Sequence, residues 1–367
     1  MKYLRAMLRI SCVCFAIAAA STVHAAEFSA DSPEIQYFGR WDARDGVYRC
    51  GYGATYIKAN FTGTSLKADI GGKGIWWRVS IDGGEFRRLS PRGKDTVLAR
   101  NLPPGEHKVL FVRSTEGQAG ISEFRGFTVD DGAALREPDP LKERRLEFVG
   151  DSITAGAGLE GVWGGRNAYH DVEDNDMSYG PQLARMLAAD YSVIAKSGQG
   201  VALNYAEKRP ARGVHACDSY AWTFFSNKFG PENLEWDAAR FPVDATIVSI
   251  GTNDFLSGSV PPSEMEFKEA YKKIIDVVRR KNPGKAIICM EPVPEWVGAE
   301  VRDWIRQVVG NARLLGDRKV YFVPLHEDGP LLEESDYIDG KTHPTKEGSR
   351  KIADYLKDKV AAILGWQ

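Results

Sequence analysis

The chain has 367 residues, of which 43 % are hydrophobic, 11 % aromatic and 27 % charged. This apolar share excludes a disordered chain, and the length predicts two domains, since one domain usually takes roughly 100 to 200 residues. The 48 basic and 50 acidic residues give a formal charge of −2, without the Lys and Arg excess that neutralises phosphates. A nucleic-acid partner is therefore not expected.

The first 25 residues have the pattern of a secretory signal peptide. Lys2, Arg5 and Arg9 precede an apolar run over 10–20, and small residues follow at the end of the segment. The run is too short to span a bilayer, and nothing caps it as an N-terminal core helix. Cleavage after Ala25 would leave 45 basic and 50 acidic residues, a formal charge of −5. We therefore expect a secreted or periplasmic protein with no membrane partner once residues 1–25 are removed.

The cysteines give no sign of a disulfide scaffold or of a zinc site. Cys12 and Cys14 lie in the predicted signal peptide, and Cys50, Cys217 and Cys289 remain. One disulfide among these three is permitted in an oxidising compartment, and the sequence does not say which pair would form it. Neither Cys-x-x-Cys nor His-x-x-x-His occurs, so we expect no metal and no redox cofactor.

Residues 26–128 have the period of half-buried strands. Short alternating runs at 55–61, 66–70, 76–81 and 107–112 are separated by turn signals such as Asp82-Gly83-Gly84. Seven or eight short strands without a convincing helix predict an all-β domain, an antiparallel jelly-roll sandwich.

Residues 129–144 are polar, contain Pro138-Asp139-Pro140, and are expected to form an interdomain linker. The pattern then changes over 145–367. Predominantly apolar runs at 146–149, 192–195, 245–250, 286–290 and 320–323 are typical of strands buried on both faces. Helical spacing lies between them, as in Phe267, Tyr271, Ile274, Ile275 and Val278. This alternation predicts an α/β three-layer domain with a parallel, flavodoxin-like sheet and a ligand site beyond the carboxyl ends of its strands.

Three loops at those predicted strand ends carry residues suited to acyl transfer. They are Gly150-Asp151-Ser152-Ile153-Thr154, Ser197-Gly198-Gln199-Gly200 and Gly251-Thr252-Asn253-Asp254, and Asp339-Gly340-Lys341-Thr342-His343 precedes a last helical pattern. A serine hydroxyl needs an adjacent imidazole to accept its proton, which makes Ser152 and His343 the candidate nucleophile and base. The backbone N–H groups of Ser152 and Gly198 and the amide of Asn253 are candidate oxyanion-hole donors. Gly200 is the alternative to Gly198, and Asp151 is expected to order its loop.

These four blocks resemble those of the SGNH (GDSL-type) hydrolases, a resemblance that gives Ser152, Gly198, Asn253 and His343 the roles above. Phe38-Gly39-Arg40-Trp41, the segment 59–66 and Ile81-Asp82-Gly83-Gly84 resemble the jelly-roll module that precedes the hydrolase domain in carbohydrate esterase family 2. Ser178-Tyr179-Gly180 is similar to that family as well. The resemblance covers nearly all of the predicted mature chain. It implies a serine O-acetylesterase, acetylxylan esterase-like, acting on acetylated xylan or mannan, with a leaning toward acetyl groups at a primary hydroxyl and without a cofactor.

One position departs from the pattern of many SGNH enzymes, which have Asp three residues before the histidine. Gly340 occupies that position here, and the nearest acids are Asp339 and Asp336, four and seven residues before His343. Esterases of the resembled family are similar in sometimes using a Ser-His dyad whose histidine is oriented by a main-chain carbonyl. We therefore expect Ser152 and His343 to suffice, with Asp339 either a helper or a solvated turn residue.

Three tryptophans are candidate contacts for a sugar ring, because axial C–H faces pack on aromatic faces. They are Trp163, Trp222 and Trp296, and for each of them core or interdomain packing is the alternative. The expected partner is an acetylated polysaccharide or oligosaccharide, and the sequence does not predict an oligomeric state. Two alternatives stay open: an esterase acting on a bacterial cell-wall sugar or another acyl ester, and an inactive carbohydrate-binding relative. A lipid substrate is disfavoured, because no long apolar lid segment occurs.

Overall fold

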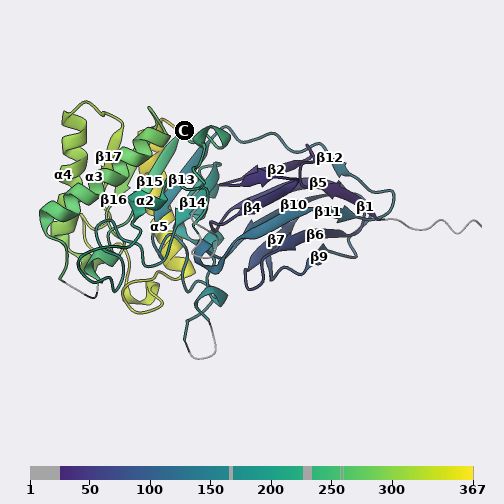
Figure 1. The fold of residues 1–367 in the computed structure, drawn as a ribbon, viewed down its shortest axis with the longest axis horizontal. Coiled ribbons are helices and arrows are strands. Elements are labelled where there is room, and N and C mark those ends of the chain that lie inside the picture. The colour runs from purple at the N-terminus through teal and green to yellow at the C-terminus, as the bar shows by residue number, and fades with distance from the viewer. Residues whose placement is uncertain (1–24, 165–167, 226–233, 257, 259, 367) are drawn as a thin grey trace, which may run out of the picture.

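The computed structural model describes residues 25–164, 168–225, 234–256, 258 and 260–366. Apart from Ala25, the predicted signal peptide lies outside these residues. Figure 1 shows two domains side by side, an all-β domain in purple and blue and an α/β domain in green and yellow. The predicted order of a β-sandwich followed by an α/β domain is confirmed.

The N-terminal domain packs two antiparallel sheets, each of six strands in the described residues. One sheet contains β3 (Asp42–Arg44), β4 (Val47–Cys50), β11 (Ser122–Val129), β6 (Leu66–Gly71) and β9 (Gly93–Ala99) in spatial order, with β1 (Ala26–Ser29) paired to β11. The other contains β12 (Leu135–Arg136), β5 (Tyr56–Thr62), β10 (Glu106–Arg113), β7 (Trp77–Ile81) and β8 (Arg87–Leu89), with β2 (Ile35–Phe38) paired to β5. The sequence predicted fewer strands because β1, β3, β8 and β12 have two to four residues, too few to show alternation.

The segment predicted as a linker contributes to the sandwich. Strand β12 lies within residues 129–144 and pairs with β5, with Leu135 opposite Phe61 and Arg136 opposite Asn60. Leu135 is 5 % exposed and belongs to the sandwich core. Apolar burial thus binds part of this polar segment to the N-terminal domain.

The C-terminal domain has a parallel sheet in the order β14 (Asp190–Ala195), β13 (Arg145–Gly150), β15 (Ala245–Ser249), β16 (Ala286–Met290) and β17 (Val320–Val323). Helices α1 (Tyr179–Met186) and α5 (Lys346–Leu364) pack on each other and on one core cluster, and α3 (Glu264–Lys281) and α4 (Ala299–Leu314) pack on the other. The predicted apolar face at 267–278 is buried in α3, which begins with a capping box between Ser263 and Glu266. A short helix, α2 (Ala216–Ser219), precedes α3.

The two domains share a continuous core. Phe38 stacks on Tyr56 at a ring distance of 4.5 Å, and Tyr56 packs on Tyr191 of the C-terminal domain at 4.7 Å. The Tyr56 hydroxyl donates to Asp190 Oδ1 at 2.8 Å. Arg40, 1 % exposed, forms an ion pair of 3.0 Å with Glu147 on β13. The Phe-Gly-Arg-Trp motif therefore lies where the sandwich meets the parallel sheet.

Cys50, Cys217 and Cys289 are free thiols. Within the described residues, no helix is long and apolar enough to cross a bilayer.

Candidate active site

The order of the parallel strands brings three of the predicted loops to one edge. Strand β13 lies between β14 and β15, and the loops after these strands carry Ser152, Gly198 and Asn253. In an open parallel sheet, ligands bind beyond the carboxyl ends of the strands, where the strand order reverses. The loop before α5 brings His343 to the same edge.

Three side chains form a hydrogen-bonded series at this edge. Ser152 Oγ lies 2.9 Å from His343 Nε2, and His343 Nδ1 lies 2.7 Å from Asp339 Oδ2. An ionised carboxylate only accepts hydrogen bonds, so Nδ1 carries the proton and Nε2 is free to accept the Ser152 hydroxyl proton. This is the tautomer that a general base toward serine requires.

Asp339 reaches His343 because the intervening residues fold back on its carboxylate. Oδ1 accepts the backbone N–H groups of Lys341, Thr342 and His343 at 3.3, 2.7 and 3.0 Å. Partial burial opposes ionisation, but hydrogen bonds from the His343 ring and from these N–H groups prevail and hold the pKa of Asp339 well below its usual range. The observed partner of Nδ1 is thus a carboxylate rather than a main-chain carbonyl.

The other nearby acid, Asp336, lies elsewhere. Its Oδ2 accepts from the backbone N–H of Glu333 at 2.9 Å and from Lys351 Nζ at 2.8 Å, on the first turns of α5. Asp336 therefore supports the start of the last helix.

The loop that carries Ser152 needs a glycine before it. A Cβ at Gly150 would lie 2.0 Å from Thr154 Oγ1 and 2.7 Å from the Ser249 carbonyl of the neighbouring strand. Asp151 is 2 % exposed, and its Oδ1 accepts the Ile153 N–H at 3.0 Å. Burial raises the pKa of Asp151 to about 6. The predicted role of Asp151, ordering its loop, agrees with these contacts.

The Asn253-Asp254 pair joins the three strand-end loops. Asn253 Nδ2 donates to Asp151 Oδ2 at 3.2 Å and to the Gln199 carbonyl at 2.9 Å. The Asp254 carboxylate accepts the N–H groups of residues 201, 202 and 203 at 3.0, 2.7 and 2.9 Å. Burial raises the pKa of Asp254 to about 6, and those N–H groups counter part of the rise. The Asn253 amide thus already uses both its N–H groups, and a bond to an oxyanion would replace one of them.

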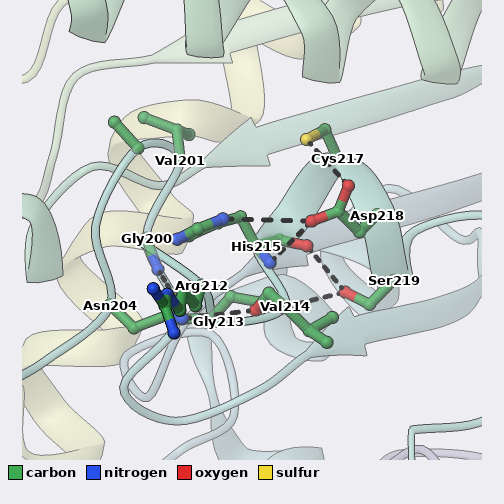
Figure 2. A network of polar contacts seen from close by, with 12 residues as sticks. Gly200, Val201, Asn204, Arg212, Gly213, Val214, His215, Cys217, Asp218 and Ser219 are labelled. Atoms are coloured by element: carbon green, nitrogen blue, oxygen red, sulfur yellow. Dashed lines mark hydrogen bonds and ion pairs between the residues drawn. The ribbon is translucent and has the colours of Figure 1, made fainter. Parts of the chain in front are cut away.

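The two rival glycines after β14 differ in their surroundings. Gly198 has φ +77° and lines the cavity in front of Ser152, and a Cβ there would meet Tyr205 Cβ in ordinary van der Waals contact at 3.5 Å. Gly200 donates its N–H to Asn204 Oδ1 at 3.1 Å, a bond drawn in Figure 2. A Cβ at Gly200 would lie 1.9 Å from the Leu203 carbonyl. Gly200 therefore makes the turn compact, and Gly198 faces the cavity.

The cavity has a volume of about 520 Å³ and is lined by residues from both domains. Trp163 forms one wall, with its ring edge-on to His343 at 4.9 Å and an interplanar angle of 87°. Tyr169, Ser197 and Tyr205 line it as well, and Gln118 reaches it from the sandwich. Ser197 belongs to one of the loops that the sequence predicted. Tyr169, Tyr205 and Gln118 carry no sequence signal, and for Gln118 the pattern of one domain gives no sign of which loop of the other domain it meets.

The other two candidate tryptophans lie outside this cavity. Trp222 stacks on Phe225 at 5.9 Å, and its carbonyl accepts a 2.7 Å hydrogen bond from the Arg40 guanidinium. Trp296 packs against the core and donates its Nε1–H to the Lys341 carbonyl at 3.1 Å, beside the histidine loop. Packing between domains accounts for Trp222, and loop support accounts for Trp296, so of the three candidate tryptophans Trp163 is the one that lines the cavity.

One group of side chains in the described residues has the atom types of a metal site. Ligand atoms of Glu116, His170 and Glu173 lie within 4.8 Å of one another. Each is engaged in hydrogen bonds, including His170 Nδ1 to Glu173 Oε1 at 2.9 Å and the Glu116 N–H to Glu173 Oε2 at 3.1 Å. Burial raises the pKa of both glutamates to about 8. We assign this group to the polar contact between the domains.

A parallel α/β domain that holds serine, histidine and aspartate in hydrogen-bonded series at its carboxyl edge has the arrangement of carboxylic ester hydrolases. Comparison with known families agrees with that class. Residues 148–351 match the model of the GDSL-like lipase/acylhydrolase family, and residues 37–138 match that of the carbohydrate esterase 2 N-terminal domain. The chain belongs to the GDSL-like lipase/acylhydrolase family, with the N-terminal domain of a family 2 carbohydrate esterase. The predicted class and family are confirmed.

Individual relatives support the same assignment. The chain is 31 % identical over 344 residues to the cellulase/esterase CelE of Acetivibrio thermocellus, covering 92 % of this chain and 40 % of that protein. It is 24 % identical to an acetylxylan esterase/glucomannan deacetylase of Cellvibrio japonicus, covering 84 % of each. A family two carbohydrate esterase structure from Clostridium thermocellum, solved with cellohexaose, has a TM-score of 0.79 at 28 % identity, covering 91 % of this chain and 100 % of that one.

Proposed function

We propose that this protein is a serine O-acetylesterase that removes acetyl groups from an acetylated polysaccharide of the xylan or mannan type. The observation that carries this proposal is the hydrogen-bonded series Ser152–His343–Asp339, which opens onto a cavity beside Gly198. The description of the Cellvibrio japonicus relative as an acetylxylan esterase and glucomannan deacetylase supports the substrate class.

In the first half of the proposed reaction, Ser152 Oγ attacks the acetyl carbonyl carbon while His343 Nε2 takes the hydroxyl proton. Negative charge develops on the acetyl oxygen, and the N–H groups of Ser152 and Gly198 stabilise it. Asn253 joins them by giving up its longer bond, the one of 3.2 Å to Asp151. The tetrahedral intermediate collapses to acetyl-Ser152, and the sugar oxygen leaves with the proton from His343.

In the second half, a water molecule gives a proton to His343 Nε2 and attacks the acetyl-enzyme. The intermediate then releases acetate, and Ser152 Oγ takes the proton back from His343. The Asp339 carboxylate stabilises the imidazolium in both halves through Nδ1. Trp163 presents an aromatic surface to the sugar ring next to His343. With the N-terminal segment 1–25 acting as an export signal, this reaction would take place in the periplasm or outside the cell.

The test is acetate release from acetylated xylan, acetylated glucomannan and O-acetylated peptidoglycan, with wild type and Ser152→Ala side by side. We expect release from xylan or glucomannan, its loss in Ser152→Ala, and covalent labelling of wild type alone by a fluorophosphonate. Release from peptidoglycan only would assign a cell-wall substrate instead. Without acetate release from any polymer and without labelling, the esterase proposal fails.

A further inference from the structure

The loop after β14, residues 197–200, carries the proposed oxyanion donor Gly198 and is held by residues of the N-terminal sandwich. These belong to the segment 113–120, which begins at the last residue of β10 and contains the short 3-10 helix η1 (Gly117–Ala119). Gln118 Nε2 donates to the Ser197 carbonyl at 3.1 Å, and the Ser197 N–H donates to Glu116 Oε2 at 2.6 Å. Gln118 Nε2 also donates to Glu116 Oε1 at 3.0 Å, which joins the two sandwich side chains.

The Ser197 carbonyl and the Gly198 N–H belong to the same peptide group. A peptide group is planar and trans, so its C=O and N–H bonds point in opposite directions. A donor that fixes the Ser197 carbonyl therefore also fixes the direction of the Gly198 N–H, the proposed oxyanion donor. Donation to a carbonyl also polarises the N–H of that peptide, which strengthens it toward an anion.

The segment 113–120, which carries Glu116 and Gln118, is itself held by many hydrogen bonds. Arg113 is fully buried, and its guanidinium donates to the carbonyls of Cys50, Thr115, Glu116 and Gly120 at 2.6 to 3.1 Å. A Cβ at Gly117 would lie 2.3 Å from the Phe225 carbonyl of the catalytic domain. Close backbone contact between the domains thus fixes where Glu116 and Gln118 stand.

Ser197 is also held from its own domain. The Tyr169 hydroxyl donates to Ser197 Oγ at 2.7 Å, and Lys196 Nζ reaches the Ser197 carbonyl at a longer 3.4 Å. Neither contact replaces Gln118, since Tyr169 holds the side chain and Lys196 offers a long, flexible donor. The shorter bond to the carbonyl comes from the sandwich.

Resting on the proposed esterase function, we infer that Gln118 is a positioning residue for catalysis: through the Ser197 carbonyl it aims the Gly198 N–H at the oxyanion. Glu116 supports it by accepting the preceding N–H. The sandwich thereby contributes to the rate of the chemical step as well as to the shape of the cavity.

The test compares kcat and KM for 4-nitrophenyl acetate, together with thermal unfolding, in wild type and Gln118→Leu. Leucine is similar in size to glutamine and has no hydrogen-bond donor. Because Gln118 is only half-buried, the variant should fold. Glu116→Ala is less suitable, because it would leave buried polar groups without hydrogen-bond partners. We expect kcat to fall roughly 10- to 100-fold, less than the 10²- to 10³-fold typical when an oxyanion donor is deleted, because the Gly198 N–H is still present. KM should change by less than about twofold, since the acetyl ground state does not need this bond.

Tyr56→Phe is the matched control. It removes a hydrogen bond across the same domain interface, to Asp190, at a place that does not line the cavity. Its kcat should equal that of wild type. Unchanged kcat in Gln118→Leu, or an equal loss in Tyr56→Phe, would overturn the inference. A wild type that is neither active nor labelled by fluorophosphonate would instead overturn the esterase proposal, so the two failures are distinguishable.

Discussion

Replacing Asp339 by asparagine tests whether its carboxylate takes part in catalysis. The substitution keeps the shape and one carbonyl oxygen, which can still accept the N–H groups that Oδ1 accepts now. The amide nitrogen then faces His343 Nδ1, where the carboxylate stands at 2.7 Å. An N–H donor at this place favours the tautomer with the proton on Nε2, which cannot accept the Ser152 proton.

The size of the loss follows from burial and geometry. A fully buried triad aspartate changed to asparagine costs about 10⁴-fold in kcat in a known serine protease. The Asp339 side chain is 33 % exposed and that of His343 15 %, so water screens the lost charge in part. We expect kcat to fall about 10²- to 10³-fold, which corresponds to about 3 to 4 kcal/mol. His343→Ala, which removes the base itself, should lose more.

The assay is the kcat for 4-nitrophenyl acetate from pH 5 to 9, with enzyme folding checked by thermal unfolding. Asp336→Asn is the control, because it changes an acid of the same loop that pairs with Lys351 and does not contact His343. Asp339→Asn within tenfold of wild type would refute the reasoning and leave Ser152 and His343 as a dyad. A loss equal to that of His343→Ala would make Asp339 a full triad member.

Three further predictions concern stability and substrate contact. Arg40→Ala should lower the free energy of unfolding in urea by about 3 to 5 kcal/mol, because it leaves the buried Glu147 without its cationic partner. Lys272→Ala, which breaks an exposed pair with Asp276, should cost less than about 1 kcal/mol. Trp163→Ala should raise KM for an acetylated oligosaccharide at least about fivefold, and an equal change for 4-nitrophenyl acetate would contradict a sugar contact. Burial raises the pKa of Glu173 to about 8, so its contribution to stability is complete below about pH 4 and is lost as the pH rises through 8. Unfolding in urea at pH 5, 7 and 9 should show this fall, and Glu173→Gln should flatten it; an equally steep fall in the variant would contradict the assignment.

The site residues that the sequence predicted are those that immediately follow buried parallel strands. Runs such as 146–149 and 245–250 are mostly apolar, and the strands they predict are buried on both faces, which identifies the edge to which Ser152 and Asn253 belong. The spacing of His343 before the helix α5 places it at the same edge. These inferences need only local pattern and the rules of parallel sheets.

The reach of Asp339 was beyond sequence reasoning because it depends on backbone geometry. Asp339 lies four residues before His343, and its carboxylate meets Nδ1 only because the backbone N–H groups of 341–343 turn toward that carboxylate. The choice of Gly198 over Gly200 as the candidate oxyanion donor likewise depends on a tight turn, in which the Gly200 N–H already donates to Asn204. Gln118 gave no signal at all, since its role arises when two domains that are separate in sequence pack together.

Glycines at the domain boundary show how closely this packing is built. A Cβ at Gly53 of the sandwich would lie 2.0 Å from Asn175 Oδ1, and one at Gly51 would lie 2.2 Å from Phe224 Cβ. The side chain of the C-terminal domain thus occupies the space that a Cβ on the sandwich residue would need, and only glycine leaves that space free. The buried Arg40–Glu147 pair and the Phe38–Tyr56–Tyr191 stack extend the same contact across the sheet. The sandwich therefore packs against the C-terminal domain as a layer of one shared core. The loop that carries Ser197 and Gly198 lies against that layer.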